Sequence, residues 1–201
     1  MILYGGWFAM VGLGGYLLHG YLASYLIRVV GLSPTEAFSA NLVAVMTLAV
    51  GAVTGGYLVD RYRPATIALA SAIGVGVLVV PCFLLIQRGT VASAILGQIP
   101  IAAGLGIAST FGATLSVSLF PAEVRYTATG FAHNVTLFGS TAPYVSTWLI
   151  ARIGSASAPA RYLAGMTLVG VTVAAVLLTA GRASVPSSVR HAAMTARRPP
   201  A

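Results

Sequence analysis

Six long apolar segments, separated by short polar gaps, dominate the pattern of this 201-residue chain. Each segment is long enough to cross the hydrocarbon core of a bilayer, which takes about 20 apolar residues in an α-helix. Backbone N–H and C=O groups must be hydrogen-bonded internally in lipid, so we expect every segment to be a helix. The expected helices cover residues 4–27, 37–59, 65–87, 92–119, 126–151 and 162–180.

The composition agrees with a protein whose solvent is mostly lipid. Hydrophobic residues make up 58% of the chain and charged residues 7%, and the mean hydropathy is +0.92. A typical soluble domain carries roughly 25% charged residues. The alternating pattern of membrane β-strands is absent from the sequence. We therefore predict an all-α membrane protein, a six-transmembrane-helix bundle over residues 1–180, followed by a basic, disordered cytoplasmic tail over residues 181–201.

The arginines predict the orientation of the chain. All 11 basic residues are arginine, and the net charge is +8. An even number of spans puts both chain ends on one side, and cytoplasmic loops carry an excess of basic residues. The side of the two ends holds Arg61, Arg63, Arg125, Arg182, Arg190, Arg197 and Arg198, and the other side holds Arg28, Arg88, Arg152 and Arg161. We expect both termini in the cytoplasm of a bacterial cell and the chain in its inner membrane.

The types and positions of the polar residues argue against an enzyme, a cofactor or a metal site. Lysine is absent, so the chain has neither a P-loop lysine nor a Schiff-base lysine. The single Cys82 lies inside an apolar segment, and the six segments contain no Asp or Glu. Three scattered histidines form no metal or nucleophile–base set. Because the arginines are dispersed or confined to the tail, a nucleic-acid partner is not expected either.

One of the three acidic residues lies in a short gap between two apolar segments. The end of the first of these segments and the gap after it read Gly56-Tyr-Leu-Val-Asp60-Arg61-Tyr-Arg63. A glycine permits the close approach of a neighbouring helix, and an Asp at a helix end suits the positive N-terminus of another helix. Such a contact can act as a latch between conformations. The alternative is a topology-setting loop in which Asp60 only neutralises an arginine.

This gap resembles the G-x-x-x-D-R core of a loop motif in the major facilitator superfamily. Three further stretches, residues 25–45, 119–134 and 138–150, resemble the later helices and loops of metabolite:proton symporters in that superfamily. Their order and spacing match helices seven to twelve of such transporters. The chain departs from the family pattern in its length, because the family has two six-helix halves and this chain has one.

The resemblance implies half of a major facilitator fold, with an N-terminal six-helix half as its partner, whether from the same gene, a separate chain or a second copy. It implies secondary active transport of a small polar metabolite of the organic acid, amino acid or betaine type, driven by proton symport and alternating access. The alternative is a truncated or partner-dependent membrane protein without independent transport activity. Membrane lipid, the substrate and protons are the expected partners.

Polar side chains inside the apolar segments are the candidates for a substrate path, because ionisable groups at membrane depth are costly and usually functional. Tyr16 and His19 share one helix face at a spacing of three residues. His133 and Asn134 lie in the fifth segment, and Gln98 begins a polar face of the fourth. Hydrogen-bonded packing roles stay open for these residues. The resemblance implies that the carboxylate for proton coupling lies in the other half.

A second pair of charges, Glu123 and Arg125, falls on the same expected side of the membrane as Asp60 and Arg61. We expect the two loops to form a charge network that acts as a cytoplasmic gate.

The small and the aromatic residues give two further expectations, one for helix packing and one for the membrane interface. Gly51 and Gly55 form a GxxxG pair, which favours close helix packing in lipid. Trp7, Tyr25 and Trp148 fall near segment ends, where aromatic belts are typical.

Overall fold

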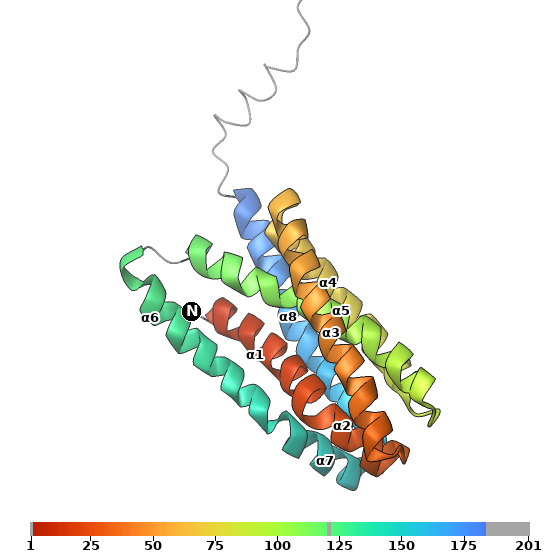
Figure 1. Ribbon diagram of the computed structural model, residues 1–201. Helices are drawn as coiled ribbons and strands as arrows, with labels where there is room; N and C mark the ends of the chain where they lie inside the picture. The colour runs from red at the N-terminus through yellow and green to blue at the C-terminus, as the bar shows by residue number, and fades with distance from the viewer. Residues whose placement is uncertain (1, 120–121, 184–201) are drawn as a thin grey trace, which may run out of the picture.

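The structure is a computed structural model that describes residues 2–119 and 122–183. These residues form a bundle of helices with no strand among them (Figure 1). The elements are α1 (Ile2–Tyr16), the π-helical turn η1 (Leu17–Tyr21), α2 (Leu22–Tyr25), a second π-helical turn η2 (Leu26–Val30), α3 (Pro34–Arg61), α4 (Pro64–Ile86), α5 (Val91–Leu119), α6 (Ala122–Val135), the 3₁₀ segment η3 (Thr136–Thr141), α7 (Ala142–Ile153) and α8 (Ala158–Ala183). The predicted all-helical fold is confirmed.

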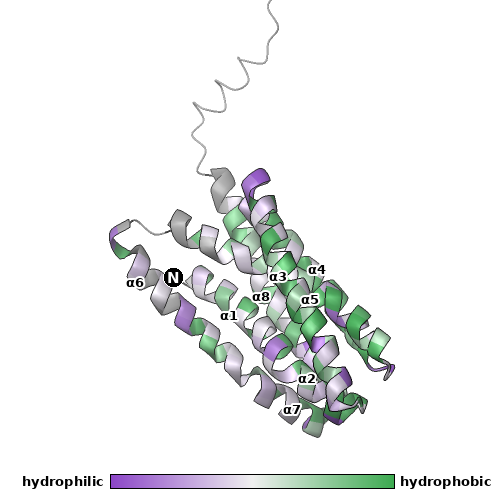
Figure 2. Ribbon diagram, in the orientation of Figure 1, coloured by the Kyte–Doolittle hydropathy of each residue, from purple (hydrophilic) through white to green (hydrophobic). Residues whose placement is uncertain are grey.

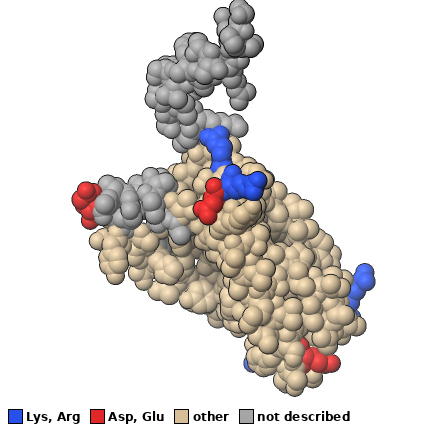
Figure 3. All heavy atoms as spheres, turned by 45° about the horizontal axis from the view of Figure 1, so that its top comes forward, with Lys and Arg blue, Asp and Glu red and all other residues tan. Residues whose placement is uncertain are grey.

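Five helical stretches of the described chain are long and apolar enough to cross a membrane. They are Leu3–Val30, Pro34–Arg61, Pro64–Ile86, Val91–Gly112 and Ala158–Thr179. The charged side chains in view lie at the ends of this bundle (Figure 3), and apolar residues predominate along α3, α4 and α5 (Figure 2). This distribution suits an apolar slab with polar boundaries, since charges at mid-membrane are costly.

The fifth expected segment, residues 126–151, is a composite of α6, η3 and α7 that runs beside α1 (Figure 1). Its 3₁₀ stretch ends just before Pro143, in the first turn of α7. Proline lacks a backbone N–H and its ring clashes with the carbonyl four residues earlier, so regular α-helix is disfavoured across this point.

Local signals in the sequence set several helix ends. Ser33 caps α3, since its hydroxyl accepts a hydrogen bond from the Glu36 backbone N–H while the Glu36 carboxylate accepts one from the Ser33 backbone N–H. Pro34 occupies the first helical position, where a missing N–H costs nothing. The first span and α7 end at Gly31 and Gly154, which adopt left-handed φ values of 85° and 69°.

Close contact between helix backbones holds α3 against α5. A Cβ atom on Gly51 would lie 2.7 Å from the backbone oxygen of Ala103, and one on Gly55 would lie 2.9 Å from the Cα of Ile107. A side chain on either glycine would therefore force the helices apart. The predicted GxxxG contact is confirmed, and its partner surface is α5.

A second glycine contact, between α1 and η3, joins the first span to the fifth. A Cβ atom on Gly139 would lie 2.5 Å from the backbone carbon of Gly12, and one on Gly12 would lie 2.9 Å from the Cα of Thr136. The two backbones touch without intervening side chains. This contact fixes the place of η3 along α1.

Two of the three expected belt aromatics are core residues instead. Trp7 is fully buried, and its indole N–H donates to the backbone oxygen of Ala108 at 3.2 Å. Tyr25 is 1% exposed, and its hydroxyl donates to the backbone oxygen of Ala156 at 2.8 Å. Each polar atom finds a carbonyl partner inside the bundle, so neither ring needs the interface. Trp148 is half-exposed, as a belt residue requires.

The Gly12–Gly139 contact predicts that Gly139→Ala destabilises the bundle. Overpacking a tight site costs about 1–3 kcal/mol, so the apparent Tm of the purified chain in detergent should fall by several degrees. Gly130→Ala in the same span is the matched control, because a Cβ at Gly130 meets no atom within 4 Å. Equal melting temperatures for the two variants would contradict the contact.

Candidate functional site

A cavity of about 460 Å³ lies where α1 and η1 meet α5, α6 and η3. It brings together three of the side chains expected on a substrate path, namely Tyr16, His19 and His133. Phe8, Ser109 and Thr136 contribute further to its lining. Residues more than 110 positions apart in the sequence thus converge on one cavity, which we name the histidine pocket.

His19 occupies a π-helical turn in this pocket. The turn spans Leu17–Tyr21, and the Nδ1 atom of His19 lies 2.8 Å from the backbone oxygen of Gly15. Because a carbonyl oxygen only accepts, Nδ1 carries the proton of this hydrogen bond, which leaves Nε2 of the neutral ring as an acceptor. Single π-helical turns inside α-helices are rare overall. Those that occur are often found at functional sites. The His19 side chain is exposed on the surface of the bundle.

His133 reaches the same pocket from α6. Its ring packs edge-on against Phe8 of α1, with the ring centroids 5.8 Å apart, and its side chain is exposed. The pocket wall between the two histidines is formed partly by Gly12 and Thr136. The α1–η3 backbone contact described above therefore also builds the histidine pocket.

Two other expected path residues lie elsewhere. Gln98 is fully buried inside the bundle, where its Nε2 donates to the backbone oxygen of Ala94 at 3.0 Å and its Oε1 has no hydrogen-bond partner. Asn134 is exposed, and its Nδ2 donates to the backbone oxygen of Gly130 at 2.8 Å. Neither residue lines the histidine pocket. Gln98 is enclosed within this bundle, and its place on a substrate path stays a prediction.

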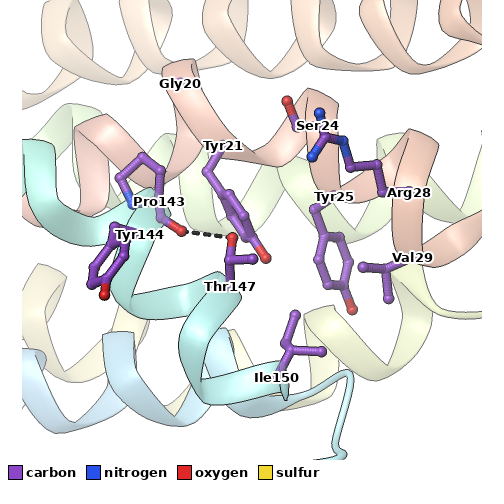
Figure 4. A pocket seen from close by; sticks show the side chains of 10 residues that line it. All are labelled: Gly20, Tyr21, Ser24, Tyr25, Arg28, Val29, Pro143, Tyr144, Thr147 and Ile150. Carbon is purple, nitrogen blue, oxygen red and sulfur yellow. Dashed lines mark hydrogen bonds between the residues drawn. The ribbon is translucent and has the colours of Figure 1, made fainter. Parts of the chain in front are cut away.

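A second cavity, of about 410 Å³, lies between the first span and α7 (Figure 4). Its polar and aromatic lining comes from Tyr21, Ser24, Tyr25, Arg28, Tyr144 and Thr147. We name it the tyrosine pocket. The sequence analysis did not predict this pocket. The sequence does contain a signal for it, because residues 21, 24, 25 and 28 have the spacing of one helix face.

The last turn of α3 and the loop to α4 carry the charges expected at a gate. Asp60, Arg61 and Arg63 are exposed, and the Nη1 of Arg61 donates to the Tyr57 hydroxyl at 2.7 Å. No ion pair is present among the side chains that the structure describes. A Cβ on Gly56 would meet no atom within 4 Å, so Gly55, rather than Gly56, makes the close approach within this chain.

The other expected gate residues lie at the start of α6. Glu123 is exposed, and the side chain of Arg125 lies outside the described part of the chain. Across residues 2–119 and 122–183, no group of three or more His, Cys, Asp or Glu side chains gathers as a metal ion requires.

Comparisons with known proteins identify relatives of one kind. The chain is 26% identical over 157 residues to the ectoine/proline transporter ProP of Corynebacterium glutamicum, covering 77% of this chain and 31% of that protein. It is 33% identical over 175 residues to a protein of Staphylococcus haemolyticus named as a proline/betaine transporter, covering 83% of this chain and 36% of that protein. The chain is a homologue of proline/betaine transporters of the major facilitator type.

A third relative extends the range of substrates. The glycine betaine/proline/ectoine/pipecolic acid transporter OusA of Dickeya dadantii is 26% identical over 157 residues, 78% of this chain and 31% of that protein. No family model matches the chain. The chain spans about a third of the length of these relatives. They are transporters, which supports the expectation that the chain is not an enzyme.

The histidine pocket predicts different water access for two of the expected path residues. In a Cys82→Ala background of the membrane-embedded chain, His19→Cys should react with a charged, water-soluble thiol reagent at least about tenfold faster than Gln98→Cys, because the reagent attacks hydrated thiolates. Labelling rates in isolated membranes give the comparison. Equal rates for the two cysteines would contradict the predicted access of water to His19.

Proposed function

We propose that this six-helix bundle is the C-terminal half of a secondary active transporter for a small zwitterionic metabolite, of the proline, glycine betaine or ectoine kind. The observation that carries the proposal is the convergence of Tyr16, His19 and His133 on one cavity in a homologue of such transporters. The transporter takes up its substrate by proton symport and alternating access. It lies in the bacterial inner membrane with both termini in the cytoplasm.

A zwitterionic substrate fits the charges of this half. The expected spans contain no Asp, Glu or Arg, so they offer no full countercharge to a substrate with net charge. Proline and betaines carry one positive and one negative group and need hydrogen-bonding partners and dipoles rather than a net countercharge. The imidazole and phenol groups of the histidine pocket supply donors and acceptors of this kind.

The proton-coupling group belongs to the other half in this proposal. A carboxylate that takes up and releases a proton is a common device of membrane carriers, and none lies within the expected spans here. The N-terminal six-helix half therefore supplies it and closes the histidine pocket from the opposite side. The two halves rock against each other around a substrate held near the midplane.

The last turn of α3 and the loop to α4 act as a gate in this mechanism. Asp60 has no hydrogen bond or ion pair with the side chains that the structure describes and is exposed at the bundle end. Its carboxylate is thus available to a helix N-terminus of the other half in one conformation. Gly56 faces open space beside it and leaves room for that helix.

Transport by the complete protein tests the function. Cells that express the chain together with its N-terminal half should accumulate radiolabelled proline or glycine betaine, and a protonophore should abolish uptake. His19→Ala should raise the half-saturation concentration roughly tenfold, because a hydrogen bond to a charged group contributes about 1.5–3 kcal/mol. Thr172→Ala, on an exposed face of α8, is the control and should leave uptake unchanged. Membrane-inserted protein that takes up neither compound would refute the proposal.

The gate predicts a separate effect of Asp60→Asn. This variant should insert normally and bind substrate, but its uptake should slow about tenfold, which corresponds to about 1.4 kcal/mol on the limiting barrier. Glu36→Gln, at the opposite end of α3, removes a carboxylate that only caps a helix and should retain normal turnover. Initial uptake rates at saturating substrate measure the difference. Normal turnover in Asp60→Asn would show that this carboxylate has no gating role.

A further inference from the structure

Arg28 is the charged residue among those that line the tyrosine pocket. It lies in η2, just before Gly31 ends the first span. Helical side chains lean toward the helix N-terminus, so an arginine at this position must bend outward to place its guanidinium in water. Figure 4 shows that Arg28 does not bend outward, because its guanidinium lies beside Ser24, one helical turn deeper in the span. A charge turned inward toward lipid is costly unless a partner meets it there.

The described part of the protein does not supply that partner. Glu36 lies at the same end of the bundle, but its carboxylate belongs to the cap of α3 and accepts from the Ser33 backbone N–H and hydroxyl. Among the side chains drawn in Figure 4, the one hydrogen bond joins the Thr147 hydroxyl to the backbone oxygen of Pro143 at 2.8 Å. The Arg28 guanidinium and the Ser24 hydroxyl therefore keep their donors for a ligand of the pocket.

The end of the bundle around this pocket is positively charged. Arg88 lies between α4 and α5, Arg152 lies in the last turn of α7, and Arg161 lies near the start of α8. The guanidinium of Arg152 lies over the Trp148 ring, 5.8 Å from its centroid, and Arg161 donates to two serine hydroxyls, so neither charge is balanced by a described carboxylate. The summed field of these arginines favours an anion in the pocket over a cation.

Exposed apolar surface adjoins the charged group. Tyr21 and Tyr25 are buried in the core and form the floor of the cavity, while Val29 and Tyr144 line it and are exposed at its rim. Trp148 of α7 is half-exposed close by, and such residues mark the depth at which lipid headgroups begin. A ligand of this rim thus meets a cationic group and an apolar surface side by side, at the boundary of the membrane.

We propose that the rim of the tyrosine pocket binds the phosphate group of an anionic phospholipid. Arg28 and the Ser24 hydroxyl donate to the phosphate oxygens, and an acyl chain lies over Val29 and Tyr144. Guanidinium groups bind phosphate through two parallel hydrogen bonds, and basic pockets between membrane helices accept lipid headgroups. The inference does not depend on the transport proposal, because it uses only the membrane setting and the residues of this chain.

Native mass spectrometry of the full chain, stripped of lipid in detergent and titrated with defined lipids, tests the site. Phosphatidylglycerol should bind about tenfold more tightly than phosphatidylcholine with the same acyl chains, because the choline ammonium meets the positive field of this end. Arg28→Gln should weaken the binding of phosphatidylglycerol about tenfold, and Arg28→Lys should restore part of it. Ser24→Ala should weaken it about threefold, as expected for the loss of one hydrogen bond.

Arg152→Gln is the matched control for a general effect of charge. Arg152 lies at the same end of the bundle but outside the pocket, so this variant should bind phosphatidylglycerol as the wild type does. The Arg28 side chain is exposed, so Arg28→Gln should keep the Tm of the wild type in lipid-free detergent. Unchanged binding in Arg28→Gln, or an equal loss in Arg28→Gln and Arg152→Gln, would overturn the proposal.

A soluble phosphate compound shares the chemistry of this headgroup, and competition distinguishes the two sources. Glycerophosphoglycerol is the headgroup of phosphatidylglycerol without its acyl chains. It should compete for the wild-type chain at least about tenfold more weakly than the intact lipid, because it has no chain to cover the apolar rim. Equal competition by the free headgroup would assign the pocket to a soluble phosphate compound and overturn the lipid site.

Discussion

Backbone contact between helices at glycine is the constraint on which this structure depends. Lipid tails are as apolar as leucine, so helices in a membrane gain little from burying apolar side chains and associate through close packing and hydrogen bonds. Gly51 and Gly55 bring α3 against α5, and Gly12 meets Gly139 where α1 crosses η3. The second contact also builds the histidine pocket, because Gly12 and Thr136 line that cavity.

The helical architecture was predictable, because apolar segment length and the absence of buried charge are direct signatures of a membrane span. The GxxxG contact was predictable because two glycines four positions apart favour close helix packing in lipid. The burial of Trp7, Tyr25 and Gln98 was not predictable. Hydropathy identifies a span but does not tell which face of the helix meets lipid and which meets protein. The π-helical turns at His19 and Arg28 also escaped prediction. No local residue pattern that we used marks such a turn.

The candidate sites were also predictable only in part. The spacing of Tyr16 and His19 predicted a shared face, and the structure adds His133 from a distant segment. The tyrosine pocket follows one helix face that the sequence displays, but its other wall comes from α7, which no local pattern connects to it. Both pockets border the irregular turns of the first span. Local departures from α-helix thus coincide with the places where polar groups gather in an otherwise apolar bundle.

The central claim is that this bundle works as one of two halves. Native mass spectrometry of the protein, isolated from its source cells in lipid nanodiscs, tests it most directly. We expect the 20.5 kDa bundle together with a second six-helix unit in one-to-one ratio, either as a separate chain or within one longer polypeptide. A particle that contains the 20.5 kDa chain alone, with no second helical unit, would contradict the account.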